Sequence, residues 1–360
     1  MCFVMGSHWA VVMGGAQYQA KCIIEQLVSS DEFKVFYLAR IIDKSIKPKD
    51  YRIIQIAGNN GIRKYGYLFD TIPLTRLLRE INPDVIYQRG LKAYTGILAR
   101  FAQRNDCRFI FHIAHDYDVT PKQSLSLHWL FRSLEKSIGE YGLKRAKYVI
   151  AQTKQQCRYL KENYNREDGI IIPNFHPSPE EEIDKPKRPI RVVWIANFKS
   201  MKRPELFVRL AKDLKDYKNV EFIMIGRQGN KKHYAELHDE ISKTKNLKYL
   251  GELSIDEVNQ VLAKSHLFVN TSLAEGFPNT FIQAWMRQVP VVSVNVNTDG
   301  VLDGGVTGIH GRTYEGMKKA VTIFLESDEF RTNMGQRAQE YAFKHHSTNN
   351  VKKLIELIKA

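Results

Sequence analysis

One carboxylate, Glu275, stands in a loop whose neighbours could hold a phosphorylated ligand. The loop Glu275-Gly276-Phe277-Pro278 follows a short apolar run at residues 267–269, which predicts a buried strand. Asn279 or Thr280 is then expected to cap a helix over residues 281–287. Backbone N–H groups at a helix start, beside the carboxyl end of a strand, suit the phosphates of a nucleotide. The same turn would also serve an ordinary strand–helix–strand crossover.

A second group of polar side chains ends a predicted strand in the first half, at residues 109–113. Strand alternation places His112 on a face of that strand, whereas His115 and Asp116 lie beyond its end. A histidine titrates near neutrality, so His115 could orient a hydroxyl or carry a proton. His112 also fits a core position, and Asp116 and Asp118 also fit a loop turn. Arg89, at the end of a strand over residues 85–88, could meet an anionic group or form a surface ion pair.

Strand and helix patterns alternate twice along the chain, which predicts two doubly wound parallel sheets of the α/β class. The expected strands cover residues 2–5, 33–38, 85–87, 109–113, 148–151, 192–195, 221–225, 248–250, 267–269 and 291–294. Between the two halves, residues 172–190 contain five prolines, an acidic run and a basic run without periodicity, as a linker does. Two such domains and one linker predict a cleft with ligands at the carboxyl ends of the strands.

Composition is that of a globular chain, with 43% hydrophobic and 26% charged residues among 360. The net charge of +15 favours an anionic partner: nucleic acid, an anionic membrane or a phosphorylated substrate. A basic but merely solvated surface is an equal alternative. No apolar window is long enough to cross a bilayer, and residues 1–13 are interpreted as a strand and loop rather than a signal peptide. The four cysteines show no paired spacing, which favours reduced thiols.

The segment around Glu275 resembles the donor-site signature of retaining glycosyltransferases of family four, the group 1 glycosyl transferases with the GT-B fold. That signature has two glutamates eight positions apart, and here Glu275 matches the first while Gln283 stands at the second. The resemblance implies that Glu275 hydrogen-bonds hydroxyls of the donor sugar and that residue 283 holds the ribose. Glutamine keeps this hydrogen-bonding capacity but carries no charge.

Other segments resemble the same family. Gly14-Gly15 matches its glycine loop, where the backbone approaches the donor phosphates, although adjacent glycines are usually only turns. Lys202 matches its phosphate-binding lysine, and Asn197 stands where an arginine is common; Lys199 or Arg203 could substitute but suit a solvated loop better. His115-Asp116 matches a His-Asp near the reacting sugar. The implied donor-side residues are Gly14, Gly15, Asn197, Lys202, Arg227, Glu275, Gly276, Phe277, Pro278, Asn279, Thr280 and Gln283, with Arg89 on the acceptor side.

The resemblance implies an N-terminal acceptor-side domain over residues 1–174, a linker over 175–189, a nucleotide-sugar domain over 190–340, and a C-terminal helix over 341–360 that packs back on the first domain. It also implies transfer of a sugar from a nucleotide-sugar donor to a hydroxyl of a glycan or lipid-linked acceptor, with catalytic candidates His115, Asp116 and Glu275. No metal or other cofactor is expected, although Asp116-Tyr117-Asp118 has the Asp-x-Asp spacing of metal-dependent sugar transferases.

Residues 61–81 mix basic and aromatic side chains with an apolar stripe, as either a membrane-docking element or a core-facing helix does. With the basic charge this favours a cytoplasmic enzyme, peripheral at the inner face of the cell membrane. Two other functions stay open: a nucleotide-sugar epimerase of the same architecture, and a sugar-nucleotide or glycan-binding subunit with little catalysis. Nucleic-acid binding is not expected, because no stacking or groove-reading motif accompanies the charge.

Overall fold

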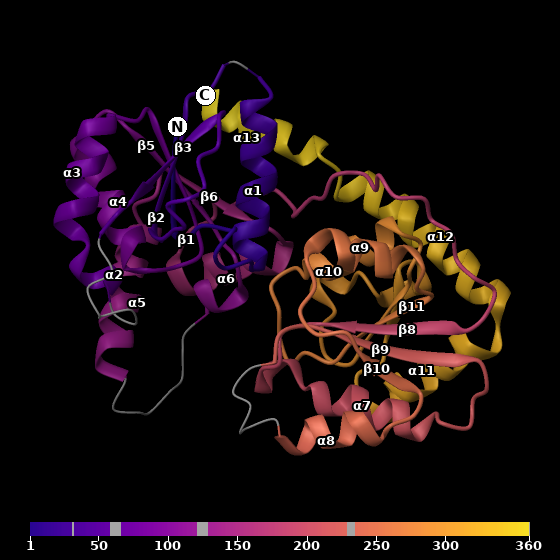
Figure 1. The fold of residues 1–360 in the computed structure, drawn as a ribbon. Coiled ribbons are helices and arrows are strands. Elements are labelled where there is room, and N and C mark those ends of the chain that lie inside the picture. The colour runs from indigo at the N-terminus through magenta and orange to yellow at the C-terminus, as the bar shows by residue number, and fades with distance from the viewer. Residues whose placement is uncertain (31, 58–65, 121–128, 229–234, 360) are drawn as a thin grey trace. The chain divides into compact units, whose positions relative to one another are not determined.

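The computed structural model describes residues 1–30, 32–57, 66–120, 129–228 and 235–359 (Figure 1). By its internal contacts the chain divides into two compact units. The first comprises Met1–Phe175 together with the C-terminal segment from Asn349, and the second comprises His176–Thr348. The chain therefore passes between the units twice, at Phe175/His176 and at Thr348/Asn349.

The first unit is built on a seven-stranded, wholly parallel sheet with the order β3-β2-β1-β4-β5-β6-β7. From β1 the chain adds β2 and β3 on one side, and then returns to add β4 on the other side of β1. The strand order thus reverses between β1 and β4. The strands are β1 (Cys2–Ser7), β2 (Val35–Ile41), β3 (Tyr51–Gln55), β4 (Val85–Arg89), β5 (Arg108–His112), β6 (Tyr148–Ala151) and β7 (Ile170–Ile171).

Helices cover both faces of this sheet, as its near-continuous apolar strands require. Leu74 and Leu78 of α3 and Leu98 of α4 pack with Leu143 and Leu160 on one side of the sheet. The C-terminal helix α13 packs against α1, where Lys359 pairs with Glu32. The helices are α1 (Gly15–Val28), α2 (Gly66–Phe69), α3 (Thr71–Ile81), α4 (Ala93–Arg104), the 3-10 turn η1 (Asp116–Asp118), α5 (Trp129–Leu143), α6 (Lys154–Tyr164) and α13 (Asn349–Lys359).

The second unit repeats the plan with a six-stranded parallel sheet in the order β10-β9-β8-β11-β12-β13. Here the chain adds β9 and β10 on one side of β8 and then returns to β11 on the other, so the order reverses between β8 and β11. The strands are β8 (Ile190–Ile195), β9 (Val220–Ile225), β10 (Leu247–Tyr249), β11 (Leu267–Asn270), β12 (Val291–Ser293) and β13 (Gly308–His310).

Alternate residues of β8 enter separate cores on the two faces of the second sheet. Val192 and Trp194 pack with α7, α8 and α11, whereas Val193 packs with α9, α10 and α12. The helices are the 3-10 turn η2 (Ser200–Lys202), α7 (Pro204–Asp213), α8 (Ala235–Lys243), α9 (Ile255–Ala263), α10 (Asn279–Met286), the 3-10 turns η3 (Thr298–Gly300) and η4 (Asp303–Gly305), α11 (Tyr314–Glu326) and α12 (Asp328–His345).

The prediction of two doubly wound parallel sheets is confirmed, and each of the ten predicted strands overlaps an observed one. Three short strands, β3, β7 and β13, were not predicted. The segment expected to form one C-terminal helix over residues 341–360 is divided, because α12 ends at His345 and α13 begins at Asn349. The cap prediction for α10 was wrong: Pro278 is the N-cap, with extended backbone, and Asn279 is the first helical residue. Residues 172–189 carry no helix or strand, as expected of a linker.

Candidate functional site

In the second unit the predicted site residues gather where the strand order reverses, at the carboxyl ends of β8 and β11. In an open α/β sheet the helices leave the two neighbouring strands in opposite directions at such a point, which opens a crevice for a ligand. The turn η2, which ends at Lys202, follows β8, and the loop with Glu275 follows β11. Both segments therefore border the crevice of this sheet.

Lys202 and Glu275 form an ion pair across this crevice, although they are 73 positions apart in the chain. The lysine Nζ donates to Oε1 of the carboxylate, and the two side chains keep 21% and 15% of their surface exposed. Each charge thus neutralises the other in a site that remains accessible to solvent. A ligand that carries both phosphates and sugar hydroxyls could replace this internal pairing at both ends.

Thr271, directly after β11, holds the backbone of the Lys202 turn. Its buried hydroxyl donates to the Lys202 carbonyl at 2.6 Å and accepts from Trp194 Nε1 at 2.9 Å. Arg203 Nε donates to the Thr271 carbonyl at 2.7 Å, and the arginine also binds the Asn295 side chain. The expectation that Arg203 lies in a solvated loop is therefore wrong. Arg203 joins the turn to the ends of β11 and β12, whereas Lys199 is exposed as expected.

The loop after Glu275 leads directly into the N-terminus of α10. Thr298 donates to the Gly276 carbonyl at 2.9 Å, and Phe277 packs edge-on against Trp285 at 6.1 Å between ring centroids. Asn279, at the helix start, hydrogen-bonds the buried His176 side chain. The first N–H groups of a helix have no partner within the helix. The loop is thus held firmly enough to present them beside Glu275.

Gln283 lies about one turn further along α10 and is only 7% exposed. Its Nε2 donates to Asn259 Oδ1 of α9 at 3.0 Å. Retaining glycosyltransferases of family four carry a second glutamate at this position. Here the position holds a neutral amide, which is hydrogen-bonded to the neutral side chain of Asn259.

Asn197 and Arg227 lie at the ends of neighbouring strands β8 and β9. Asn197 Oδ1 accepts the Arg227 backbone N–H at 3.0 Å, and Phe198 N–H donates to the Arg227 carbonyl at 3.0 Å. The Arg227 side chain is exposed, with Nη1 4.0 Å from Glu252. Asn197 thus joins the ends of β8 and β9 through the Arg227 backbone, while the Arg227 side chain extends to Glu252.

Gly226, which precedes Arg227, makes this approach possible. Its φ is +145°, and a Cβ there would lie 1.9 Å from the Ala196 carbonyl oxygen. Only glycine fits between the ends of β8 and β9.

In the first unit Gly14 caps α1 and Gly15 is its first residue. No acidic side chain occupies the first turn of this helix. Gln17 of that turn donates to Ser7 Oγ at 3.2 Å and so ties the helix start to the end of β1. The glycine pair accordingly lies beyond the carboxyl end of β1, where the strand order reverses between β1 and β4.

His115 caps the turn η1 after β5, and its Nδ1 accepts the Tyr117 N–H at 3.2 Å. The neutral ring then carries its proton on Nε2, so that nitrogen is a donor. Asp116 accepts from Gln156 Nε2 at 2.9 Å. Asp118 accepts the N–H groups of Leu91, Ala114 and His115 at 2.8 to 3.1 Å. Asp118 therefore anchors the loop, as the alternative prediction of a loop turn implied.

Arg89 and His112 are both buried, at 6% and 3% exposed, at the ends of β4 and β5. The alternative that Arg89 forms a surface ion pair is wrong. Its Nη1 lies 3.2 Å from His112 Nδ1, and its Nη2 donates to the Asn174 side chain. Burial lowers the pKa of His112 well below its usual value, and the charge of Arg89 adds to this effect.

Sequence reasoning missed three supporting residues, Thr271, Asn295 and Asn259. The one available signal was the polar run Asn270-Thr271-Ser272 at the end of an apolar strand. In the described ranges no three His, Cys, Asp or Glu side chains are grouped as metal ligands would be, and no described helix is both long and apolar enough to cross a membrane. None of the four cysteines forms a disulfide.

Two family models match consecutive parts of the chain. Residues 13–177 match the model described as Glycosyltransferase Family 4, and residues 177–341 match the model described as Glycosyl transferases group 1. Together they extend from the glycine loop to the last turns of α12.

Curated relatives carry glycosyltransferase names. An uncharacterized glycosyltransferase, MJ1059 of Methanocaldococcus jannaschii, is 23% identical over 63% of this chain, and the match spans 59% of that relative's length. The alpha-galactosylglucosyldiacylglycerol synthase of Streptococcus pneumoniae is 25% identical over 69% of this chain and 71% of its own.

Solved structures share the fold at low identity. WaaG, a glycosyltransferase involved in lipopolysaccharide biosynthesis, superposes with a TM-score of 0.77 at 14% identity and covers 99% of both chains. Anabaena HepE in complex with UDP and glucose superposes with a TM-score of 0.75 at 16% identity, covering 99% of this chain and 98% of that one. With both halves matched by family models and the GT-B architecture shared, the chain belongs to the group 1 glycosyl transferases.

Proposed function

We propose that this chain is a metal-independent, retaining glycosyltransferase that moves a sugar from a nucleotide-sugar donor to a hydroxyl of a glycan or lipid-linked acceptor. The observation that carries the proposal is the accessible Lys202–Glu275 pair at the β8/β11 reversal. Support for a nucleotide-sugar donor comes also from HepE, whose structures hold UDP with glucose and UDP-glucose.

In this proposal the donor's diphosphate takes Lys202 away from Glu275. The ammonium and the N–H groups at the start of α10 then face the negative charge that develops on the leaving diphosphate. Donors fixed in place before the reaction stabilise such charge without reorganisation. Glu275, released from the lysine, accepts hydrogen bonds from hydroxyls of the sugar.

The transfer step breaks the bond between the anomeric carbon and the diphosphate oxygen and forms a bond from that carbon to the acceptor oxygen. The proton of the acceptor hydroxyl leaves with the nucleoside diphosphate. Attack from the face that the diphosphate leaves retains the anomeric configuration. His115, with Nε2 as donor, orients the acceptor in the first unit, beside Asp116.

Metal independence rests on two features of the site. Lys202 supplies a positive charge for the diphosphate, and Asp118 of the Asp-x-Asp run is committed to three backbone N–H groups. Turnover should therefore be unchanged in the presence of a chelator. Loss of turnover that magnesium or manganese restores would contradict this part of the proposal.

The experiment that tests the function compares sugar transfer, or slow donor hydrolysis, in wild type and two variants. Lys202→Ala and Glu275→Ala should each lower turnover by at least about 100-fold, because each removes a contact to the reacting donor. Lys199→Ala removes an exposed lysine from the same loop and should retain wild-type rates. Wild-type turnover in Lys202→Ala would refute the site. Donor binding without any sugar transfer would favour the binding-subunit alternative, and altered donor sugar without an acceptor would favour an epimerase.

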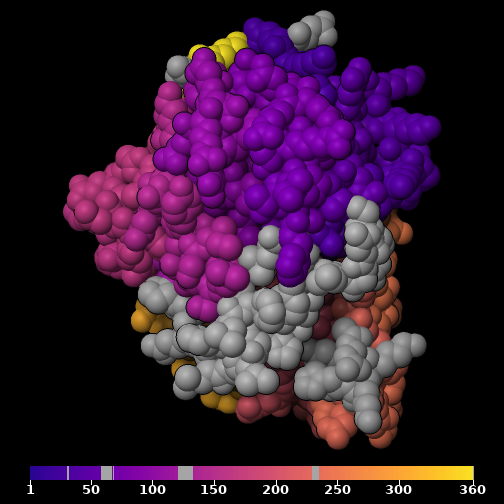
Figure 2. Space-filling view, turned by 90° about the vertical axis from the view of Figure 1, so that its left-hand side faces the viewer, coloured from indigo at the N-terminus to yellow at the C-terminus, as the bar shows by residue number. Residues whose placement is uncertain are grey.

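A lipid-linked acceptor at an anionic membrane is proposed from the surface of α2 and α3. The exposed face of α3 carries Ile72, Arg76 and Arg79 at helical spacing. Ile72 is 81% exposed. Phe69 of α2 is 64% exposed. Helices α3, α4 and α5 lie on the side of the first unit that faces the viewer in Figure 2. Residues 61–65 of the segment predicted to dock lie outside the described residues.

Large apolar side chains beside arginines suit a headgroup region, where the rings and chains enter the acyl boundary and the charges meet anionic lipid. Wild type should float with vesicles that contain phosphatidylglycerol at low salt, and the double variant Phe69→Glu/Ile72→Glu should not. Ile323→Glu, at a 40% exposed position of α11, is the matched control. Absence of vesicle binding by wild type would remove the membrane proposal and leave the transferase proposal intact.

A further inference from the structure

The first unit also has a crevice position, because its strand order reverses between β1 and β4. The last residue of β4 is Arg89, which pairs in register with His112 at the end of β5. By the same topological rule that locates the donor in the second unit, this edge is where the first unit should hold a ligand.

Among the described residues, Arg89 is a buried cation without a counter-charge. In the described part of the chain, Arg89 hydrogen-bonds His112 Nδ1 and the Asn174 and Tyr87 side chains, and it makes no salt bridge. All three partners are neutral, since burial holds the pKa of His112 below its usual value and raises the pKa of Tyr87. Removing a guanidinium from water carries a large desolvation cost, and neutral hydrogen bonds offset only part of this cost.

Two N–H donors at this position remain unused within the described residues. His112 Nδ1 accepts from the Tyr87 hydroxyl at 2.8 Å, so the neutral ring carries its proton on Nε2. That Nε2 and Arg89 Nε are both buried without a hydrogen-bond partner. Buried polar groups in folded proteins are nearly always paired, and an exception calls for a water, an ion or a functional explanation. A positive charge and two spare donors together match an oxyanion.

We propose that Arg89, His112 and Asn174 form the binding position for an oxyanion of the acceptor, either a phosphate or a sugar carboxylate. The inference rests on the proposed function, and it adds that the acceptor carries a negative charge. The guanidinium fork suits two oxygens of one such group, which a lysine cannot match in geometry. The donor's diphosphate does not compete for this position, because the second unit supplies Lys202 for it.

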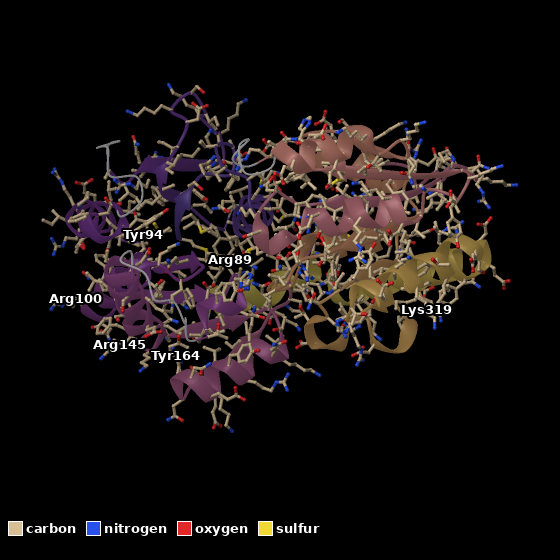
Figure 3. The ribbon with its side chains drawn as sticks, turned by 90° about the horizontal axis from the view of Figure 1, so that it is seen from below. Arg89, Tyr94, Arg100, Arg145, Tyr164 and Lys319 are labelled. Atoms are coloured by element: carbon tan, nitrogen blue, oxygen red, sulfur yellow. The ribbon has the colours of Figure 1, made fainter. Side chains whose placement is uncertain are left out.

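The first test measures binding without any turnover. Inorganic phosphate can also occupy the donor site, so the measurement uses the Lys202→Ala protein as background. In that background, phosphate should raise the melting temperature by at least about 2 °C over chloride at equal ionic strength. The shift should persist with Arg100→Gln, which removes an exposed arginine from α4 of the same unit, and vanish with Arg89→Gln (Figure 3). In Figure 3, Arg100 projects from the margin of the first unit, whereas Arg89 lies among other side chains.

Asn174→Asp gives a second test, which can be interpreted even if Arg89→Gln fails to fold. The aspartate has almost the shape of asparagine, keeps the acceptor for Arg89 and adds the missing counter-charge. It should leave the protein at least as stable as the background and still abolish the phosphate shift. If Arg89 had only a structural role, Asn174→Asp would give the same gain in stability but leave the phosphate shift unchanged. That result would overturn the proposal.

Glucuronate in a parallel titration distinguishes the two sources of the charge. A shift with phosphate that depends on Arg89 indicates a phosphorylated acceptor, and one with glucuronate indicates an acidic sugar. No shift that depends on Arg89 with either anion would overturn the proposal. In the transfer assay, Arg89→Lys should raise KM for the acceptor by at least about tenfold with the donor affinity unchanged. If no sugar nucleotide were turned over, the proposed function would be refuted. The binding of phosphate or glucuronate at Arg89 could still be interpreted, because it is measured without turnover.

Discussion

The two sheets reverse their strand order in the same way, at β1/β4 and at β8/β11, but they place opposite electrostatic arrangements there. In the second unit Lys202 is partly exposed and neutralised by Glu275. In the first unit Arg89 is buried and has only neutral partners among the described residues, and its own Nε and His112 Nε2 are unused as donors there. The same topology therefore offers one site whose charge is already balanced and one whose charge is not.

This difference teaches how each site would respond to a ligand. A ligand of the Lys202–Glu275 site must exchange an internal ion pair for its own contacts, so binding is a substitution. A ligand of the Arg89 site would supply a charge that the fold lacks, so binding is an addition. Breaking the Lys202–Glu275 pair by removing the carboxylate should raise the affinity of the second unit for an anionic ligand. Adding a carboxylate beside Arg89 should lower the affinity of the first unit for such a ligand.

The largest contrast is expected from two glycines that follow strands, Gly226 after β9 and Gly90 after β4. Gly226→Ala should destabilise the protein by about 3 kcal/mol or more, because its Cβ would lie 1.9 Å from the Ala196 carbonyl oxygen at φ +145°. Gly90→Ala, at φ +85° with its nearest neighbour at 3.4 Å, should cost only about 1–2 kcal/mol. Chemical denaturation of both variants checks this, and equal losses would show that the close approach of β8 and β9 is not special.

A smaller effect is expected from removing the charge of Glu275 while keeping its shape. Glu275→Gln should bind nucleoside diphosphate about 3–10-fold more tightly than wild type, because Lys202 no longer has to leave a carboxylate. The same variant should lose turnover with the sugar nucleotide.

Calorimetric titration measures this affinity, and Glu315→Gln is the control, since it removes an exposed glutamate that pairs with Arg209 on the surface of the same unit. Unchanged or weaker binding by Glu275→Gln would show that the ion pair does not oppose the diphosphate.

The smallest effect is expected from Gln283→Glu, which restores the second carboxylate of the resembling family. A carboxylate accepts stronger hydrogen bonds from ribose hydroxyls than an amide does, so binding of a ribonucleoside diphosphate should tighten about 2–5-fold. A 2′,3′-dideoxy analogue should bind the variant and wild type alike. An equal gain with that analogue would argue against a ribose contact. Stability should change by less than about 1 kcal/mol, because the Asn259 amide can turn to donate.

Hydrophobic periodicity was sufficient to predict the parallel sheets, because central strands such as Val192–Ile195 are apolar on both faces. The strand β13, Gly308–His310, contains one aliphatic residue and had no such signal. The break between α12 and α13 was missed because both helices keep an apolar stripe on either side of it.

For the site, the resemblance pointed to Glu275 and Lys202, and the structure shows that they pair. The supporting contacts could not be predicted, because they join positions far apart in the chain. Thr271 binds Lys202 over 69 positions, and Arg203 reaches Asn295 over 92. The burial of Arg89 was equally inaccessible, since an arginine at a strand end fits surface and interior alike until His112 and Asn174 are known to surround it.

The most direct measurement is a thermal-shift titration of wild type, Lys202→Ala and Arg89→Gln with UDP-, GDP-, ADP- and CMP-sugars. At least one sugar nucleotide should stabilise wild type by several degrees. Arg89→Gln should keep that stabilisation and Lys202→Ala should lose most of it, because the proposed function assigns the donor contact to the lysine and not to the arginine. Stabilisation by none of the four classes, or equal stabilisation of Lys202→Ala and wild type, would contradict the assignment of the donor to the second unit's crevice.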